Sequence, residues 1–125
     1  MKIIYQGYFF SNEKNALEIA KKEYLKHFNI SNNFIFFLHS VSKQESTKLN
    51  MHYFKKNSPA DVLTIPLYTN INDIYELNKD NEEVLGDIFI NRQLIKKNAL
   101  KYKKTMTEEL QLVLIHGLLH LAGYS

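Results

Sequence analysis

One segment near the end of the chain constrains the fold more than any other. Between Met106 and Leu121, almost every residue other than His, Glu, Gln and Gly is apolar, and the apolar residues fall on both sides of a helix. A helix that is apolar all round is stable only when other elements cover it. The segment therefore predicts a buried helix that runs through the core, with further elements packed around it.

The remainder of the chain is large enough to build one such core. The chain has 125 residues, 45% of them hydrophobic, with eight Phe and eight Tyr. No Pro-rich or Gly/Ser-rich linker and no internal repeat interrupts it, so residues 1–125 are predicted to form a single domain. The first thirty residues have too short an apolar run and too many charges for a signal peptide or a membrane span, so we expect a cytoplasmic protein without membrane contact.

Strand and helix signals predict an α+β fold. Ser42 with Glu45, and Thr105 with Glu108, have the spacing of capping boxes at helix starts, and Pro66 confines its strand to an end or an edge. The polar segment 68–83 is predicted to be a loop. We expect about four strands in a mixed sheet (residues 2–10, 34–41, 61–67 and 84–91) and about four helices (from Ser11 to the Asn and Ser cluster at 29–33, 42–56, 92–104 and 106–121).

Two histidines stand out on the predicted core helix. His116 and His120 lie one turn apart, about 40° around the helix axis, and Glu109 falls within about 20° of His116 two turns earlier. Two imidazoles at this spacing can bind one Zn²⁺. For the short and common HxxxH pattern taken alone, the more frequent interpretation is that both are core or cleft histidines, or partial cations at the negative end of the helix. Gly117, unfavourable inside a helix, indicates either close packing or space for a substrate.

Composition limits the chemistry of any site. The chain has no cysteine, so a metal must be held by His, Asp or Glu. The net charge of +3 permits RNA binding without the large basic excess of a dedicated nucleic-acid packaging protein. No HExxH motif is present, which argues against a metalloprotease of the type that uses that glutamate as its base.

Three separate motifs resemble one known family. HGLLHLAGY at the end of the chain, read together with PADVLTIP and VLGDIFI, resembles the bacterial rRNA maturation factors of the YbeY, or UPF0054, family. The resemblance covers most of the chain from Ser42 onward. The matching residues are Pro59, Asp61, Val62, Leu63, Leu85, Gly86, Asp87, Ile88, Glu109, His116, Gly117, Leu119, His120, Leu121, Gly123 and Tyr124.

The resemblance implies a metal-dependent, single-strand-specific endoribonuclease in rRNA maturation and ribosome quality control. Its partners would be ribosomal RNA and the small ribosomal subunit, and its cofactor one Zn²⁺ held by His116 and His120. Lys55 would supply positive charge to a phosphate. Glu109 would orient a ligand histidine, or serve as an ordinary first-turn acid that is favourable to the helix dipole. The oligomeric state is not implied.

Two departures from the family pattern bear on catalysis. The family's third metal ligand is a His two residues beyond the Tyr of the motif, whereas this chain has Ser125 after Tyr124 and then ends. We expect either a truncated sequence or a weaker site with two protein ligands and solvent. The family's LNxxYR segment ends in Arg, but LNMHYFKK here has Phe54, followed by Lys55 and Lys56. Lysine supplies charge without the bidentate grip of Arg. The alternative function is a non-catalytic, ribosome-associated RNA-binding factor.

Several other polar residues allow both a structural and a functional interpretation. Asp61 and Asp87 either hydrogen-bond to nearby backbone or face a cleft. His39 and His52 are expected to pack or lie at the surface rather than to replace the missing ligand. Six lysines that follow two of the predicted helices or lie within them either line an RNA path or form a solvated helix face. They are Lys56, Lys96, Lys97, Lys101, Lys103 and Lys104.

Overall fold

A computed structural model describes residues 1–28, 33–77 and 80–123. In chain order the elements are β1 Lys2–Gln6, α1 Ser11–His27, β2 Ile35–Ser40, α2 Lys43–Phe54, β3 Val62–Pro66, α3 Ile71–Tyr75, β4 Val84–Ile90, α4 Arg92–Lys101 and α5 Met106–Leu121. The expected α+β fold with a four-stranded mixed sheet is confirmed. Residues 29–32 of the Asn and Ser cluster lie outside the described residues. No helix in the described part of the chain is long and apolar enough to cross a membrane.

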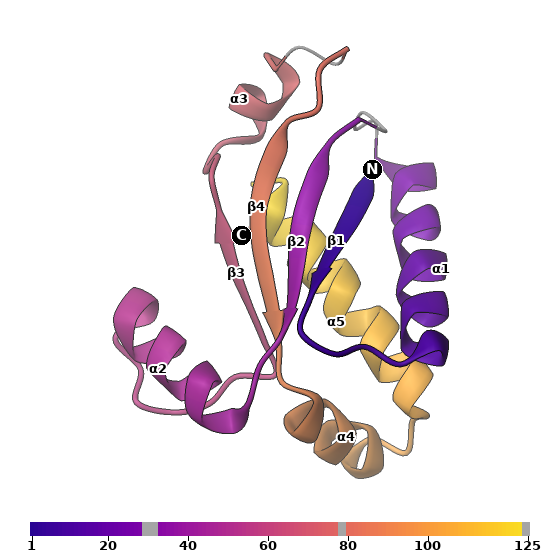
Figure 1. Cartoon of the computed structure of the whole chain (residues 1–125), viewed down its shortest axis with the longest axis vertical. Helices are drawn as coiled ribbons and strands as arrows, with labels where there is room; N and C mark the ends of the chain where they lie inside the picture. The colour runs from indigo at the N-terminus through magenta and orange to yellow at the C-terminus, as the bar shows by residue number, and fades with distance from the viewer. Residues whose placement is uncertain (29–32, 78–79, 124–125) are drawn as a thin grey trace.

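The sheet has the strand order β1-β2-β4-β3. β1 pairs with β2, and β2 with β4, in parallel, whereas β3 runs antiparallel to β4 at one edge. Pro66 is the last residue of this edge strand, as its missing N–H requires. The α1 and α5 helices cover one face of the sheet, and α2 lies beside its β3 edge (Figure 1).

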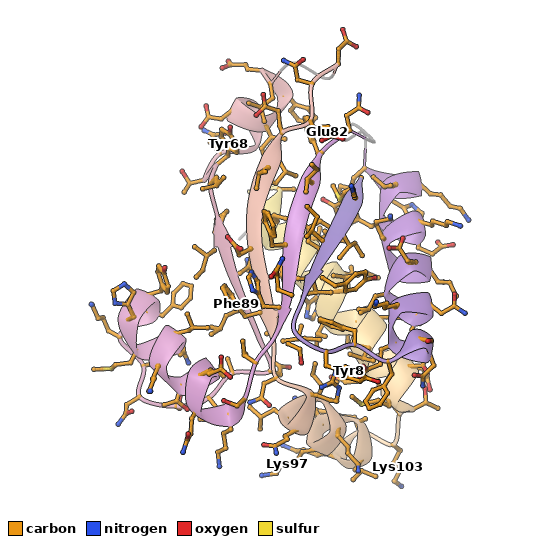
Figure 2. The ribbon with its side chains drawn as sticks, in the orientation of Figure 1. Tyr8, Tyr68, Glu82, Phe89, Lys97 and Lys103 are labelled. Atoms are coloured by element: carbon orange, nitrogen blue, oxygen red, sulfur yellow. The ribbon has the colours of Figure 1, made fainter. Side chains whose placement is uncertain are left out.

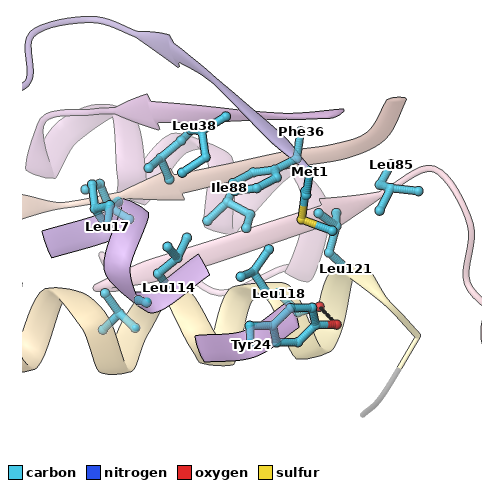
Figure 3. Packing of buried hydrophobic residues seen from close by; sticks show 14 of the residues in the cluster. Met1, Leu17, Tyr24, Phe36, Leu38, Leu85, Ile88, Leu114, Leu118 and Leu121 are labelled. Atoms are coloured by element: carbon cyan, nitrogen blue, oxygen red, sulfur yellow. Dashed lines mark hydrogen bonds between the residues drawn. The ribbon is translucent and has the colours of Figure 1, made fainter. Parts of the chain in front are cut away.

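The core forms where α5 packs between α1 and the sheet. Leu114, Leu118 and Leu121 of α5 face the strands, which contribute Phe36, Leu38 and Ile88 (Figure 3). On the other side of α5, Leu17 and Tyr24 of α1 complete the cluster, and the Tyr24 hydroxyl donates to the Leu118 carbonyl at 3.3 Å. Burying such side chains contributes about 1.5–3 kcal/mol each. The prediction of a helix inside the core is confirmed.

Helix starts follow the capping residues. Ser42 and Thr105 accept hydrogen bonds from the N–H groups of Glu45 and Glu108, and each glutamate accepts in return from its cap residue. The expected loop at 68–83, of which residues 78–79 lie outside the described part of the chain, is only partly a loop, because it contains α3. Asn70 caps this short helix by accepting from the N–H of Asn72, and the fully buried Ile74 joins the core. A single buried residue gives too weak a period to reveal such a helix.

The starts of α1 and α4 are joined by an ion pair between a buried glutamate and a partly buried arginine. Glu13 is only 5% exposed, and Arg92 donates to its carboxylate through Nε at 2.6 Å and a terminal nitrogen at 2.8 Å. The Phe10 N–H adds a third hydrogen bond at 2.8 Å. Burial alone raises the pKa of Glu13, but the hydrogen bonds from Arg92 and Phe10 and the charge of Arg92 outweigh it, so the pKa is lowered.

We expect Arg92→Met to lower the free energy of unfolding by about 3 kcal/mol near neutral pH, because Glu13 would remain buried without its partner. In the native protein the lowered pKa of Glu13 gives stability above the ordinary value of 4.5, which is lost as pH falls through the folded value. In the variant both contributions of Arg92 that lower this pKa are lost, so the pKa of Glu13 should rise relative to the native protein. The deficit in unfolding free energy, measured by urea unfolding, should therefore become smaller as the pH falls from about 7 to below 4.5. A deficit that is constant over this range would contradict the ion-pair account.

Gly86 of β4 has no room for a side chain. Its φ is +145°, and an added Cβ would lie 2.4 Å from the Ile65 carbonyl oxygen. Gly117 on α5 has an ordinary helical backbone but little space, and an added Cβ would lie 3.0 and 3.1 Å from side-chain atoms of Ile88.

We expect Gly86→Ala to lower the free energy of unfolding by about 2–4 kcal/mol, from backbone strain and overpacking together. Gly117→Ala should change it by only about 1 kcal/mol, since helix propensity offsets the crowding. Equal effects in urea unfolding would refute this contrast.

Candidate functional site

A groove opens where the last turns of α5 meet β3 and the end of α2. Its volume is about 520 Å³. Both predicted metal ligands, His116 and His120, line it. The other lining residues come from α2, from the segment that follows it and from β3: Asn50, Phe54, Lys56, Ala60, Val62, Leu63, Thr64 and Pro66.

The packing of α5 turns the two histidines toward this groove. Leu114, Leu118 and Leu121 are buried, so residues on the opposite side of the helix face outward, and both His116 and His120 are exposed. Gly117, buried between them, lets the helix approach the sheet, since Ile88 and Thr64 occupy the space where a side chain would stand. The close-packing interpretation of Gly117 is confirmed. Thr64 also lines the groove, so this contact sets α5 directly beside β3.

Buried polar residues on α2 fix the other wall. The Ser46 hydroxyl donates to the Ala60 carbonyl and accepts from the Ala60 N–H, both at 2.9 Å. The Asn50 side-chain amide donates to the Ser58 carbonyl at 2.8 Å. Both side chains are at most 5% exposed. These bonds hold the segment between α2 and β3 against the helix, so the wall is preorganised.

The end of α2 separates the two lysines that follow it. Lys55 has a left-handed backbone, with φ of 59°, and caps the helix; its ammonium donates to the His52 carbonyl at 3.3 Å. Lys56, one residue later, lines the groove. Lys55, the predicted phosphate-binding residue, is exposed but not part of the lining. A left-handed cap at a lysine gives no distinct sequence signal, so the sequence alone did not distinguish the two.

The groove is suited to an anion. It contains Lys56 and two imidazoles, and none of the described residues that line it is Asp or Glu. A negatively charged ligand would thus meet the Lys56 ammonium and two imidazoles without a competing carboxylate.

The two histidines meet part of the requirement for a metal. They lie one turn apart and line the same groove, as a two-nitrogen site needs. Within residues 1–28, 33–77 and 80–123, however, no group of three or more His, Asp or Glu is placed to hold an ion. Residues Tyr124 and Ser125 of the family motif lie outside the described residues. The donor set therefore fits two coordination positions of a Zn²⁺ ion.

Glu109 is placed away from the groove. It is 4% exposed in the first turn of α5, about 10 Å along the helix axis from His116. Its nearest cationic partner is Lys104, whose ammonium lies 4.0 Å from one carboxylate oxygen. That oxygen is buried and accepts no hydrogen bond from the described residues. These contacts suit an acid at the positive end of the helix dipole.

The remaining candidates lie outside the groove. Asp61 accepts from the N–H of Val62 at 2.8 Å and from the Asn98 side chain at 3.2 Å, which is a structural role. Asp87 instead contacts a His39 ring nitrogen at 2.7 Å, across two neighbouring strands. The His39 ring also stacks on Phe89, with centroids 4.3 Å apart, as the packing interpretation of this histidine expects. His52 is exposed on α2.

The other predicted lysines gather at α4. Lys96, Lys97 and Lys101 lie on this helix, and Lys103 and Lys104 follow it, all exposed. Figure 2 shows Lys97 and Lys103 at the α4 end of the molecule. The histidines lie in the last two turns of α5, whereas α4 precedes its first turn (Figure 1). Of the predicted lysines, Lys56 alone lines the groove.

The groove is also lined by Asn50, Phe54 and Thr64, which no sequence pattern indicates. Asn50 and Phe54 lie in a helix whose apolar period is weak, and Thr64 is one of several β-branched residues in β3. Their meeting depends on the packing of α2 against β3, which no local pattern specifies.

Comparison with known proteins places the chain in a family. The endoribonuclease YbeY family matches residues 9–125. The endoribonuclease YbeY of Thermotoga neapolitana is 38% identical over 107 residues, which are 86% of this chain and 58% of the relative. That of Buchnera aphidicola is 35% identical over 120 residues, 89% of this chain and 71% of the relative.

A solved structure supports the same assignment. The solution structure of a protein from Thermotoga maritima aligns with a TM-score of 0.63 at 29% identity, over 100% of this chain and 74% of that chain. The chain thus spans from about half to about three quarters of the length of the proteins that it matches. The sequence motifs and the fold agree, and the chain belongs to the endoribonuclease YbeY family.

Proposed function

We propose that the protein is a metal-dependent endoribonuclease that cuts single-stranded ribosomal RNA during rRNA maturation and ribosome quality control. The supporting observation is the groove that His116, His120 and Lys56 line together, with no Asp or Glu among the described lining residues. A phosphodiester is the anion that such a groove suits, and the family carries the name of an endoribonuclease. Ribosomal RNA and the small ribosomal subunit are the proposed partners, in the cytoplasm.

His116 and His120 would hold one Zn²⁺ ion. When bound, such an ion supplies positive charge to a phosphoryl oxygen and makes nearby water more acidic, worth several kcal/mol to the transition state. The chain itself positions the two imidazoles through the buried leucines of α5 and the contact of Gly117 with Ile88. Glu109 would act only indirectly, by stabilising the start of the helix that carries both histidines.

The lysines at the end of α2 would bring the RNA backbone to the histidines. Lys56 lines the groove and can pair with a phosphate there, while Lys55, at its rim, adds charge to the approach. Phosphate neutralisation dominates the affinity of proteins for nucleic acids and makes it salt-dependent. The arrangement thus recognises the backbone rather than a base sequence.

A second candidate function is RNA binding without catalysis. It is favoured by one observation, the absence of a third metal ligand among the described residues. Catalytic zinc sites ordinarily have three protein ligands and one open position. The two candidates differ in a measurable property, because only the nuclease requires the metal.

Replacing His116 or His120 by Ala should abolish stoichiometric zinc binding and reduce cleavage of single-stranded RNA by about 100-fold or more, since each removes one of two protein ligands. Metal content of the purified protein and the rise in melting temperature on adding Zn²⁺ measure binding independently of activity. His52→Ala, on exposed α2, is the matched control and should behave as the native chain. Unchanged cleavage in both histidine variants would exclude this metal mechanism; RNA binding without cleavage or zinc in the native chain would favour the second candidate.

The contributions of Lys55 and Lys56 to RNA binding can be distinguished by how the affinity depends on salt concentration. Lys56→Ala should weaken RNA binding and reduce the slope of log K against log salt by about 0.7, the value for one phosphate contact on a single strand. Lys55→Ala should reduce it less, because its ammonium donates to the His52 carbonyl. Fluorescence anisotropy of a labelled oligoribonucleotide at several salt concentrations measures both. The reverse order would show that Lys55 makes the phosphate contact.

A further inference from the structure

Phe54 is an aromatic residue in an unusual place. It is the last residue of α2, its side chain is 46% exposed, and it lines the groove with the two histidines. Covering this ring and removing it from water would be favourable, and a ligand in the groove could do so. Isolated exposed aromatics are common at protein surfaces, but this one belongs to the wall of the proposed active site.

The neighbouring residue gives the groove a second chemical feature. The left-handed Lys55 turns the chain after Phe54, so Phe54 and Lys56 line the same groove from positions two apart. The groove thus has both an aromatic ring and a cation in its lining. Proteins that bind single-stranded nucleic acids combine these two features, with bases stacked on aromatic rings and phosphates beside basic side chains.

The surrounding residues fit a flat, largely apolar group with a charged backbone. Val62, Leu63 and Pro66 contribute an apolar wall, while His116 and His120 lie on α5 across from β3. The hydrogen bonds of Ser46 and Asn50 to the segment after α2 hold the Phe54 wall in place before a ligand arrives. A rigid platform loses little conformational entropy on binding.

We propose that Phe54 forms a stacking subsite for an unpaired RNA base next to the phosphodiester that the histidines face. The inference rests on the proposed function and adds to it a reason for preferring single strands. A base within a duplex is already stacked on its neighbours, whereas an unpaired base is free to lie against the ring. Each of the four bases has a π-face that can stack on the ring, so the subsite selects strandedness more than sequence.

The absence of tryptophan from the chain allows a direct test. Phe54→Trp introduces a single indole into the groove, and its fluorescence should be quenched when a single-stranded oligoadenylate binds but not when inorganic polyphosphate binds. Tyr53→Trp is the matched control, because Tyr53 is 50% exposed on the same helix but outside the groove lining. Its emission should not respond to either ligand.

A second pair of variants measures the contribution to binding. Phe54→Leu keeps the apolar character but removes the flat ring, and should weaken single-stranded RNA binding by about 5- to 100-fold, whereas Phe54→Trp should retain it. If anisotropy shows that RNA saturates the protein while Phe54→Trp is not quenched and Phe54→Leu binds normally, the stacking subsite is refuted and the nuclease proposal stands. If the native chain neither binds nor cuts RNA, the proposed function fails and the subsite with it.

Discussion

The contact between α5 and the sheet is the interaction on which the groove depends. Because Gly117 has no side chain, Ile88 and Thr64 lie directly against the helix backbone. The buried leucines on either side of Gly117 fix the rotation of the helix about its own axis, and that rotation decides where His116 and His120 point. A helix held farther from the sheet or rotated by one residue would turn the imidazoles away from β3 and Lys56. The geometry of the site is thus largely a consequence of core packing, set by buried residues such as Leu114, Gly117 and Ile88 that lie outside the groove lining.

The opposite wall depends on polar rather than apolar contacts. The α2 helix is mostly exposed, and few of its side chains enter the core. It is held instead by Ser46 and Asn50, whose hydrogen bonds reach the segment between α2 and β3. Buried polar groups of this kind must be satisfied by particular partners, which makes them more specific than apolar contacts of similar size. One wall of the groove is therefore held by apolar packing in the core, and the other by the hydrogen bonds of Ser46 and Asn50.

The sequence predicted what is local and periodic. The bounds of α5, both capping boxes, the edge position of Pro66 and the placement of the two histidines on one side of their helix all follow from spacing within a few residues. What it could not predict depends on contacts between distant segments. The pairing of Glu13 with Arg92 joins residues 79 apart, and that of His39 with Asp87 joins residues 48 apart. Lys56 lines the groove and Lys55 does not, because Lys55 has a left-handed backbone. The short α3 helix is held to the core by the buried Ile74. Neither feature produces a pattern in the sequence that would predict it.

Pro66 has a consequence for the kind of molecule that the groove can accept. It ends β3, the strand whose outer edge has no neighbour within the described sheet, and it also lines the groove. An exposed strand edge commonly recruits an extended polypeptide through main-chain hydrogen bonds. Proline has no N–H to offer, so a peptide laid along this edge, beside the groove, would lose one ladder bond at Pro66. Main-chain pairing here is therefore less favourable, whether with a foreign segment or with the edge of another copy of the same sheet.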